Sequence, residues 1–130
     1  MWRNLGFFYD LNHKEKAWEI SGSHDGINKF IKILKEYSEN DKNSKISEHD
    51  HFGPYAYLKI TTTEEPKMTE DQIGGSLEDI KRLSEIVEIY LQKGEKKFEI
   101  DKEYSDKNEY KLIVEVKDDD FDPSSADKAL

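Results

Sequence analysis

One cluster in the sequence has residue types that could bind a metal ion, the run His49-Asp50-His51. On a strand, side chains at positions i and i+2 point to the same side, so the two imidazoles could share a zinc ion. No HExxH or CxxC motif accompanies the run, and a third ligand would have to come from elsewhere in the chain. We therefore expect a polar turn with solvated histidines and no bound metal. The turn remains a candidate contact for a protein partner, because loops often present recognition residues.

The other short motifs lack the residues that would give them chemistry. Asp118-Asp119-Asp120 has neither the glycine nor the closing glutamate of a calcium-binding loop, so we expect a solvated acidic tail. Gly74-Gly75 matches neither glycine-rich phosphate-binding pattern, and no serine stands in a GxSxG motif. The sequence therefore predicts no catalytic residue and no cofactor, and we expect a protein that is not an enzyme.

Two helices are predicted to position the rest of the chain. Ser76 is a suitable N-cap, and Asp79 stands where a capping-box acid reaches back to the cap. Apolar residues then recur at spacings of three and four, as on one buried helix face: Leu77, Ile80, Leu83, Val87, Tyr90 and Leu91. A similar pattern follows Ser23, although Gly26 is expected to weaken that helix by about 1 kcal/mol relative to alanine.

Strand-like runs follow both helices in the same order, a short run and then a longer one: 45–47 and 55–62, then 98–102 and 110–116. This order predicts an internally duplicated β-α-β-β unit, with repeat one at about 17–62 and repeat two at about 68–117. We expect one α+β domain over 1–130, with an acidic C-terminal tail at 118–130. The predicted architecture is a mostly antiparallel sheet of about six or seven strands with two helices on one face.

Composition indicates a folded domain with a strongly acidic surface. Charged residues make up 38% of the 130 residues, yet an aromatic content of 12% is well above what disordered chains carry. The formal net charge of −9 argues against nucleic-acid binding, which needs cations that face phosphates. It suits a basic protein partner, whose approach it would accelerate. The simpler alternative is that the charge serves solubility alone.

Several features bear on the compartment. The chain has no cysteine, so it predicts neither disulfides nor a thiolate zinc site. No apolar run approaches the length of about 18 residues that a membrane span needs. The first residues are not followed by the apolar segment of a secretory signal. We therefore expect a cytoplasmic protein that does not associate with membranes.

Aromatic side chains are the remaining candidates for a contact surface. Trp18, Tyr55 and Tyr57 could lie on an exposed sheet face that binds a protein, although we expect Trp18 in the core. Residues 2–11 read as an N-terminal strand, and the acidic tail is expected to be extended with mobile last residues. The candidate partner-binding residues are thus His49, Asp50, His51, Tyr55, Tyr57, Asp118, Asp119 and Asp120.

Three stretches resemble one bacterial family. They are the run His51-Phe52-Gly53-Pro54-Tyr55-Ala56-Tyr57-Leu58, the helix start Gly74-Gly75-Ser76-Leu77-Glu78-Asp79-Ile80-Lys81-Arg82-Leu83, and the closing Asp119-Asp120-Phe121-Asp122-Pro123. Together with Glu19-Ile20-Ser21-Gly22-Ser23 they make most of the chain similar to the immunity protein 32 family of polymorphic toxin systems. Gly26 and the polar run at 45–47 are variations of this sequence.

The resemblance implies a small cytoplasmic antitoxin that binds a cognate toxin domain and blocks its active site by occlusion. The resemblance implies no catalytic residue in this chain. The acidic surface favours a basic toxin, and a nuclease is the class that charge alone suggests. The alternative interpretation is a non-catalytic structural module that is a monomer or pairs as a homodimer through a sheet edge or face.

Overall fold

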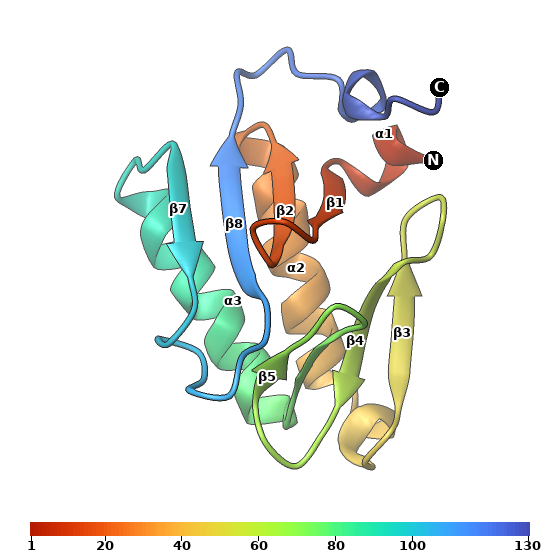
Figure 1. The fold of residues 1–130 in the computed structure, drawn as a ribbon, viewed down its shortest axis with the longest axis vertical. Helices are drawn as coiled ribbons and strands as arrows, with labels where there is room; N and C mark the ends of the chain where they lie inside the picture. The colour runs from red at the N-terminus through yellow and green to blue at the C-terminus, as the bar shows by residue number, and fades with distance from the viewer.

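The computed structural model describes residues 1–130, which form an α+β fold of three α-helices and two four-stranded sheets. The helices are α1 (Trp2–Leu5), α2 (His24–Glu39) and α3 (Leu77–Gln92), with short 3-10 turns η1 (Asp41–Ser44) and η2 (Pro123–Ala126). Figure 1 shows α2 and α3 side by side on the same side of the strands. No helix has the length and apolar character needed to cross a membrane.

Local sequence explains the two long helices. The Ser76 hydroxyl accepts the Asp79 N–H at 3.1 Å, and the Asp79 carboxylate accepts the Ser76 N–H at 3.0 Å, which confirms the capping box. Ser23 caps α2 with one bond only, since its hydroxyl accepts the Gly26 N–H at 3.1 Å and Gly26 has no side chain to reach back to the cap. Apolar positions that recur along each helix are buried against the sheets and the neighbouring helix.

Each sheet has two inner strands that run parallel and two outer strands that run antiparallel to their neighbours. In order across the first sheet, the strands are β1 (Phe8–Asn12), β2 (Ala17–Gly22), β8 (Lys111–Val116) and β7 (Lys97–Ile100). In order across the second sheet, they are β3 (His49–Phe52), β4 (Leu58–Thr62), β6 (Ile73–Gly75) and β5 (Lys67–Met68).

The prediction of a single sheet of six or seven strands is wrong, because the strands divide between these two sheets. The two strands before α2 pair with the two after α3, whereas the strands between α2 and α3 pair among themselves. Between the sheets, contacts are local and irregular. On one side Tyr110 and its neighbour donate backbone N–H groups to the Met68 carbonyl at 3.0 and 2.9 Å. On the other side Tyr9 of β1 contacts the β3–β4 connection.

The buried side chains of both helices and both sheets form one continuous core. Trp18 lies in this core with no exposed area, as expected, and its indole N–H donates to the Thr69 carbonyl at 2.8 Å. Strand β8, which the apolar run at 110–116 predicted, is an inner strand between β2 and β7.

Three local predictions are wrong. Residues 2–11 are not one strand, because Gly6 adopts φ +93° and ends α1 before β1 begins. The His49–Pro54 segment is not only a turn, because β3 covers His49–Phe52, and no strand forms at 45–47. The C-terminal tail is not simply extended. It contains η2 and returns to α1, where Arg3 pairs with Asp122 at 2.7 Å (Figure 1).

Candidate protein-binding site

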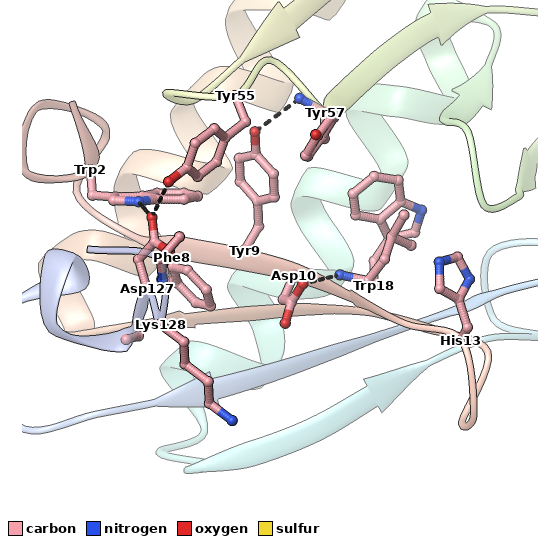
Figure 2. A pocket seen from close by; sticks show the side chains of 13 residues that line it. Trp2, Phe8, Tyr9, Asp10, His13, Trp18, Tyr55, Tyr57, Asp127 and Lys128 are labelled. Atoms are coloured by element: carbon pink, nitrogen blue, oxygen red, sulfur yellow. Dashed lines mark hydrogen bonds between the residues drawn. The ribbon is translucent and has the colours of Figure 1, made fainter.

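A pocket of about 580 Å³ lies where α1, β1, the β3–β4 connection and the end of the C-terminal tail meet (Figure 2). Its aromatic lining consists of Trp2, Phe8, Tyr9, Trp18, Tyr55 and Tyr57. Its charged and ionisable lining consists of Asp10, His13, Asp127 and Lys128. We call this feature the aromatic pocket. Pockets of this kind, apolar with a few convergent polar groups, are the usual form of a binding site.

Trp2 is the centre of the aromatic packing. Its ring centroid lies 4.7 Å from that of Phe8, 5.0 Å from Tyr9 and 6.0 Å from Tyr55. The interplanar angles of 54–71° are those of tilted and edge-to-face pairs, the geometry that aromatic rings prefer. Because Trp2 is only 2% exposed, it forms the floor of the pocket and not its open surface.

Asp127 ties the C-terminal tail to this floor. One carboxylate oxygen accepts hydrogen bonds from the Trp2 indole N–H and from the Tyr55 hydroxyl, both at 2.8 Å. The other accepts the Ala129 backbone N–H at 2.9 Å. The Trp2 bond, then the Ala129 and Tyr55 bonds, hold the pKa of Asp127 below its ordinary value, so the group stays ionised near neutral pH. These bonds join the two ends of the chain to the β3–β4 connection.

Tyr9 fixes the β3–β4 connection through two hydrogen bonds of its hydroxyl. Its hydroxyl donates to the Phe52 carbonyl at 2.6 Å and accepts the Tyr57 N–H at 3.1 Å. Burial is the main cause that raises the pKa of Tyr9, which keeps the hydroxyl protonated as a donor. Gly53 adopts φ +87°, and a Cβ there would collide with the Tyr9 ring, so the close turn requires glycine.

Tyr55 and Tyr57 form the open rim of the pocket. Their rings are stacked at a centroid distance of 6.0 Å with an interplanar angle of 26°. Tyr55 is 43% exposed and Tyr57 is 68% exposed, although tyrosines with their large apolar rings are usually more buried than this. The sequence suggested both residues for an exposed sheet face, but they lie in the β3–β4 connection, where both line the aromatic pocket.

The histidine run lies close to this rim but outside the pocket. His49 and His51 are exposed on β3, with ring centroids 5.1 Å apart, and both point to the same side as expected for a strand. Nδ1 of His49 lies 2.9 Å from the Ser47 carbonyl oxygen, and Nδ1 of His51 lies 2.9 Å from the Ala56 carbonyl oxygen. No group of three or more His, Asp or Glu side chains is placed to hold a metal ion.

The acidic triplet belongs to a different surface. Asp118, Asp119 and Asp120 are exposed beyond the end of β8. Asp119 and Asp120 line a separate shallow hollow together with Arg3 and residues at the start of α2. The candidate residues therefore lie in three places, and only Tyr55 and Tyr57 line the aromatic pocket.

Sequence reasoning missed Trp2, Phe8, Asp10 and Asp127 as parts of the site. The aromatic run at 2–11 is a usable signal, but its pattern predicts an N-terminal strand and not the lining of a pocket. For Asp127 no signal existed, because its partner Trp2 lies 125 residues away in the sequence. Comparison of the chain with protein families, with curated proteins and with solved structures finds no match. The resemblance to the immunity protein 32 family therefore stays a prediction.

Proposed function

We propose that this protein is an immunity-type inhibitor that binds a basic toxin domain and occludes its active site. The observation that carries the proposal is the stacked pair Tyr55 and Tyr57, exposed at the rim of the aromatic pocket in a chain of net charge −9. Tyrosine is enriched among the residues that dominate protein–protein binding energy, because its large ring buries apolar area and its hydroxyl remains hydrogen-bonded. The family resemblance supports the same function.

The rim is well held before any partner arrives. The Tyr57 backbone is bonded to Tyr9, and the Tyr55 hydroxyl is bonded to Asp127. Side chains that are already ordered lose less conformational entropy on binding, so more of the contact energy appears as affinity. This arrangement favours an inhibitor that presents a preformed surface. A toxin inhibitor of this type would act in the cytoplasm, which is the compartment we propose.

The test is co-expression with the protein encoded beside this chain's gene, followed by purification of the complex and measurement of growth. We expect a stable complex and restored growth. Tyr57→Ala should weaken the complex by about tenfold or more, as loss of a central interface tyrosine does. Ile89→Ala is the matched control, because Ile89 is also a large exposed side chain, at 51%, but lies on α3, outside the aromatic pocket.

The outcomes separate the function from the site. Absence of both complex and rescue contradicts the inhibitor proposal. A complex that Tyr57→Ala and Ile89→Ala affect equally would leave the inhibitor function in place but move the binding surface away from the pocket.

A homodimeric module is the second candidate, and the exposed edge of β3 favours it. This strand is at the end of its sheet, pairs only with β4, and exposes His49, Asp50 and His51. An uncovered edge can pair with the same edge of a second copy. Sedimentation equilibrium across a range of concentrations tests this reading, since a mass that stays monomeric excludes it.

The repeated element order also supports an origin by internal duplication. Both halves follow the order strand, strand, helix, strand, strand, with Ser23 and Ser76 as equivalent helix caps. We propose that the repeats, predicted at about 17–62 and 68–117 within one domain, each include the first strand of this order, so that repeat one begins near Phe8. The two strands before α2 and the two before α3 then occupy equivalent positions in the two sheets.

A further inference from the structure

We infer that the aromatic pocket receives an arginine side chain of the basic partner, with its guanidinium stacked on Tyr57 and paired with Asp10. This inference rests on the proposed function, because it identifies the group that the inhibitor recognises. It draws on three features of the pocket: unpaired carboxylates, an accessible aromatic face and a single flexible cation at the edge. Figure 2 shows Asp10 and Asp127 beneath the aromatic rim.

The carboxylates come first. Asp10 is exposed on β1, and its only hydrogen bond is from the backbone N–H of Leu11 to one oxygen, at 2.9 Å. Asp127 is hydrogen-bonded but has no cationic side chain within ion-pair distance. Two carboxylates in one pocket without a partner cation make a local field that favours a positive guest. A guanidinium can pair with a carboxylate through two parallel N–H bonds, which an ammonium cannot do.

The aromatic face decides between arginine and other cations. Tyr57 is 68% exposed, so one side of its ring is open for stacking. Cations are attracted to the face of a tyrosine ring, and the planar guanidinium also stacks on it. Such contacts are stronger when they are partly desolvated, which here requires the guest to cover part of the exposed Tyr57 ring.

The pocket's own cationic residue gives the inference a sensitive test. Lys128 lines the aromatic pocket, is exposed, and forms no ion pair. The other basic lining residue, His13, is engaged with the Tyr110 hydroxyl at 2.7 Å. Lys128 therefore opposes a cationic guest by like charge. Its removal should strengthen arginine binding, whereas a purely apolar guest would be indifferent to it.

The two tryptophans provide a reporter within the protein. The chain has only Trp2 and Trp18, and both line the aromatic pocket. The probe is the capped tripeptide acetyl-Gly-Arg-Gly-amide, and the control peptide replaces arginine with glutamine. We expect a saturable change in tryptophan emission with a dissociation constant near 1 mM or below, roughly the affinity of one anchored side chain. The glutamine peptide should give no saturable change.

Matched variants separate local recognition from general charge. Asp10→Asn and Asp118→Asn remove the same charge, but only Asp10 lies in the aromatic pocket. We expect Asp10→Asn to weaken binding by about tenfold or more, the loss typical of a charge-assisted hydrogen bond, and Asp118→Asn to leave it nearly unchanged. Lys128→Ala should bind the arginine peptide more tightly.

The inference is overturned if arginine and glutamine peptides give the same emission change, or if neither gives a saturable change up to about 10 mM, where even weak anchoring would register. It is also overturned if Asp10→Asn and Asp118→Asn weaken binding equally, since steering by net charge would then suffice. These results do not decide the inhibitor function, which depends on the complex and on growth. A complex that forms normally with Asp10→Asn would retain the function and reject the arginine anchor.

Discussion

Replacement of Gly26 by alanine should destabilise the protein, although helix propensity alone favours the opposite result. Gly26 lies in the first turn of α2, where alanine would stabilise a helix by about 1 kcal/mol. A Cβ built at this position collides with the carbonyl oxygen of Gly6. That oxygen belongs to the backbone at the end of α1 and cannot rotate away as a side chain could.

The expected size follows from these two opposing effects. Overpacking of a close contact costs about 1–3 kcal/mol, and a rigid backbone neighbour places this case near the upper end. After the gain in propensity is subtracted, we expect Gly26→Ala to lower the free energy of unfolding by about 1–2 kcal/mol. Urea denaturation followed by tryptophan fluorescence measures the change. We expect the urea midpoint to fall while the slope of free energy against urea concentration stays constant.

Asn28→Ala is the control for propensity, because the only side-chain contact it removes is an exposed hydrogen bond between the Asn28 amide and Nδ1 of His24, at 3.3 Å. Asn28 is exposed on the same helix, so its replacement should stabilise the protein by up to about 0.7 kcal/mol. The reasoning fails if Gly26→Ala raises the urea midpoint as Asn28→Ala does. Such a result would mean that α1 moves away from α2 at little cost.

Two further predictions concern the helix caps and the C-terminal tail. Ser23→Ala and Ser76→Ala should each lower the free energy of unfolding by about 1 kcal/mol, measured by urea denaturation. The reason is that each hydroxyl accepts one first-turn N–H at 3.1 Å. The double variant should lose the sum of the two effects. Because folding lowers the pKa of Asp127, its carboxylate stabilises the folded state at pH values above the ordinary pKa of 3.8. This contribution is lost as the pH falls through the lowered pKa of the folded state. Asp127→Asn should therefore lose stability at neutral pH and show a flatter dependence on pH as the pH falls below about 4, measured by urea denaturation at each pH.

The helices could be predicted from sequence because the interactions that define them are local. A cap such as Ser76 and its partner Asp79 lie three residues apart, and the apolar period reports burial of one face. The apolar run at 110–116 is also a local signal, because a strand with little alternation is typical of a buried position, and β8 is an inner strand of its sheet.

Strand partners could not be predicted in this way. Apolar character indicates that β2 and β8 are buried, but it does not indicate that they pair in parallel across most of the chain. Short strands add to the difficulty, because β5 has two residues and carries almost no pattern. The division into two sheets is therefore a property of long-range pairing and not of any local signal.

Residues of the candidate site could be predicted only where both the residue type and the local sequence indicated an exposed contact residue. Tyr55 and Tyr57 follow a Gly-Pro turn, a setting that indicates surface aromatics. The role of Asp127 could not be predicted, because an aspartate in an acidic tail is normally a solvated group. Its hydrogen bonds to Trp2 and Tyr55 arise only after the tail has returned to α1.

The insertion of β8 between β2 and β7 has a consequence for the order in which the molecule folds. The second sheet uses strands from one continuous segment, whereas the first sheet joins strands from both ends of the chain. Long-range closure of this kind is slow, so the second sheet can assemble while β2 still lacks its neighbour. During that interval β2 exposes an unpaired edge, and the risk that nascent chains associate is then greatest.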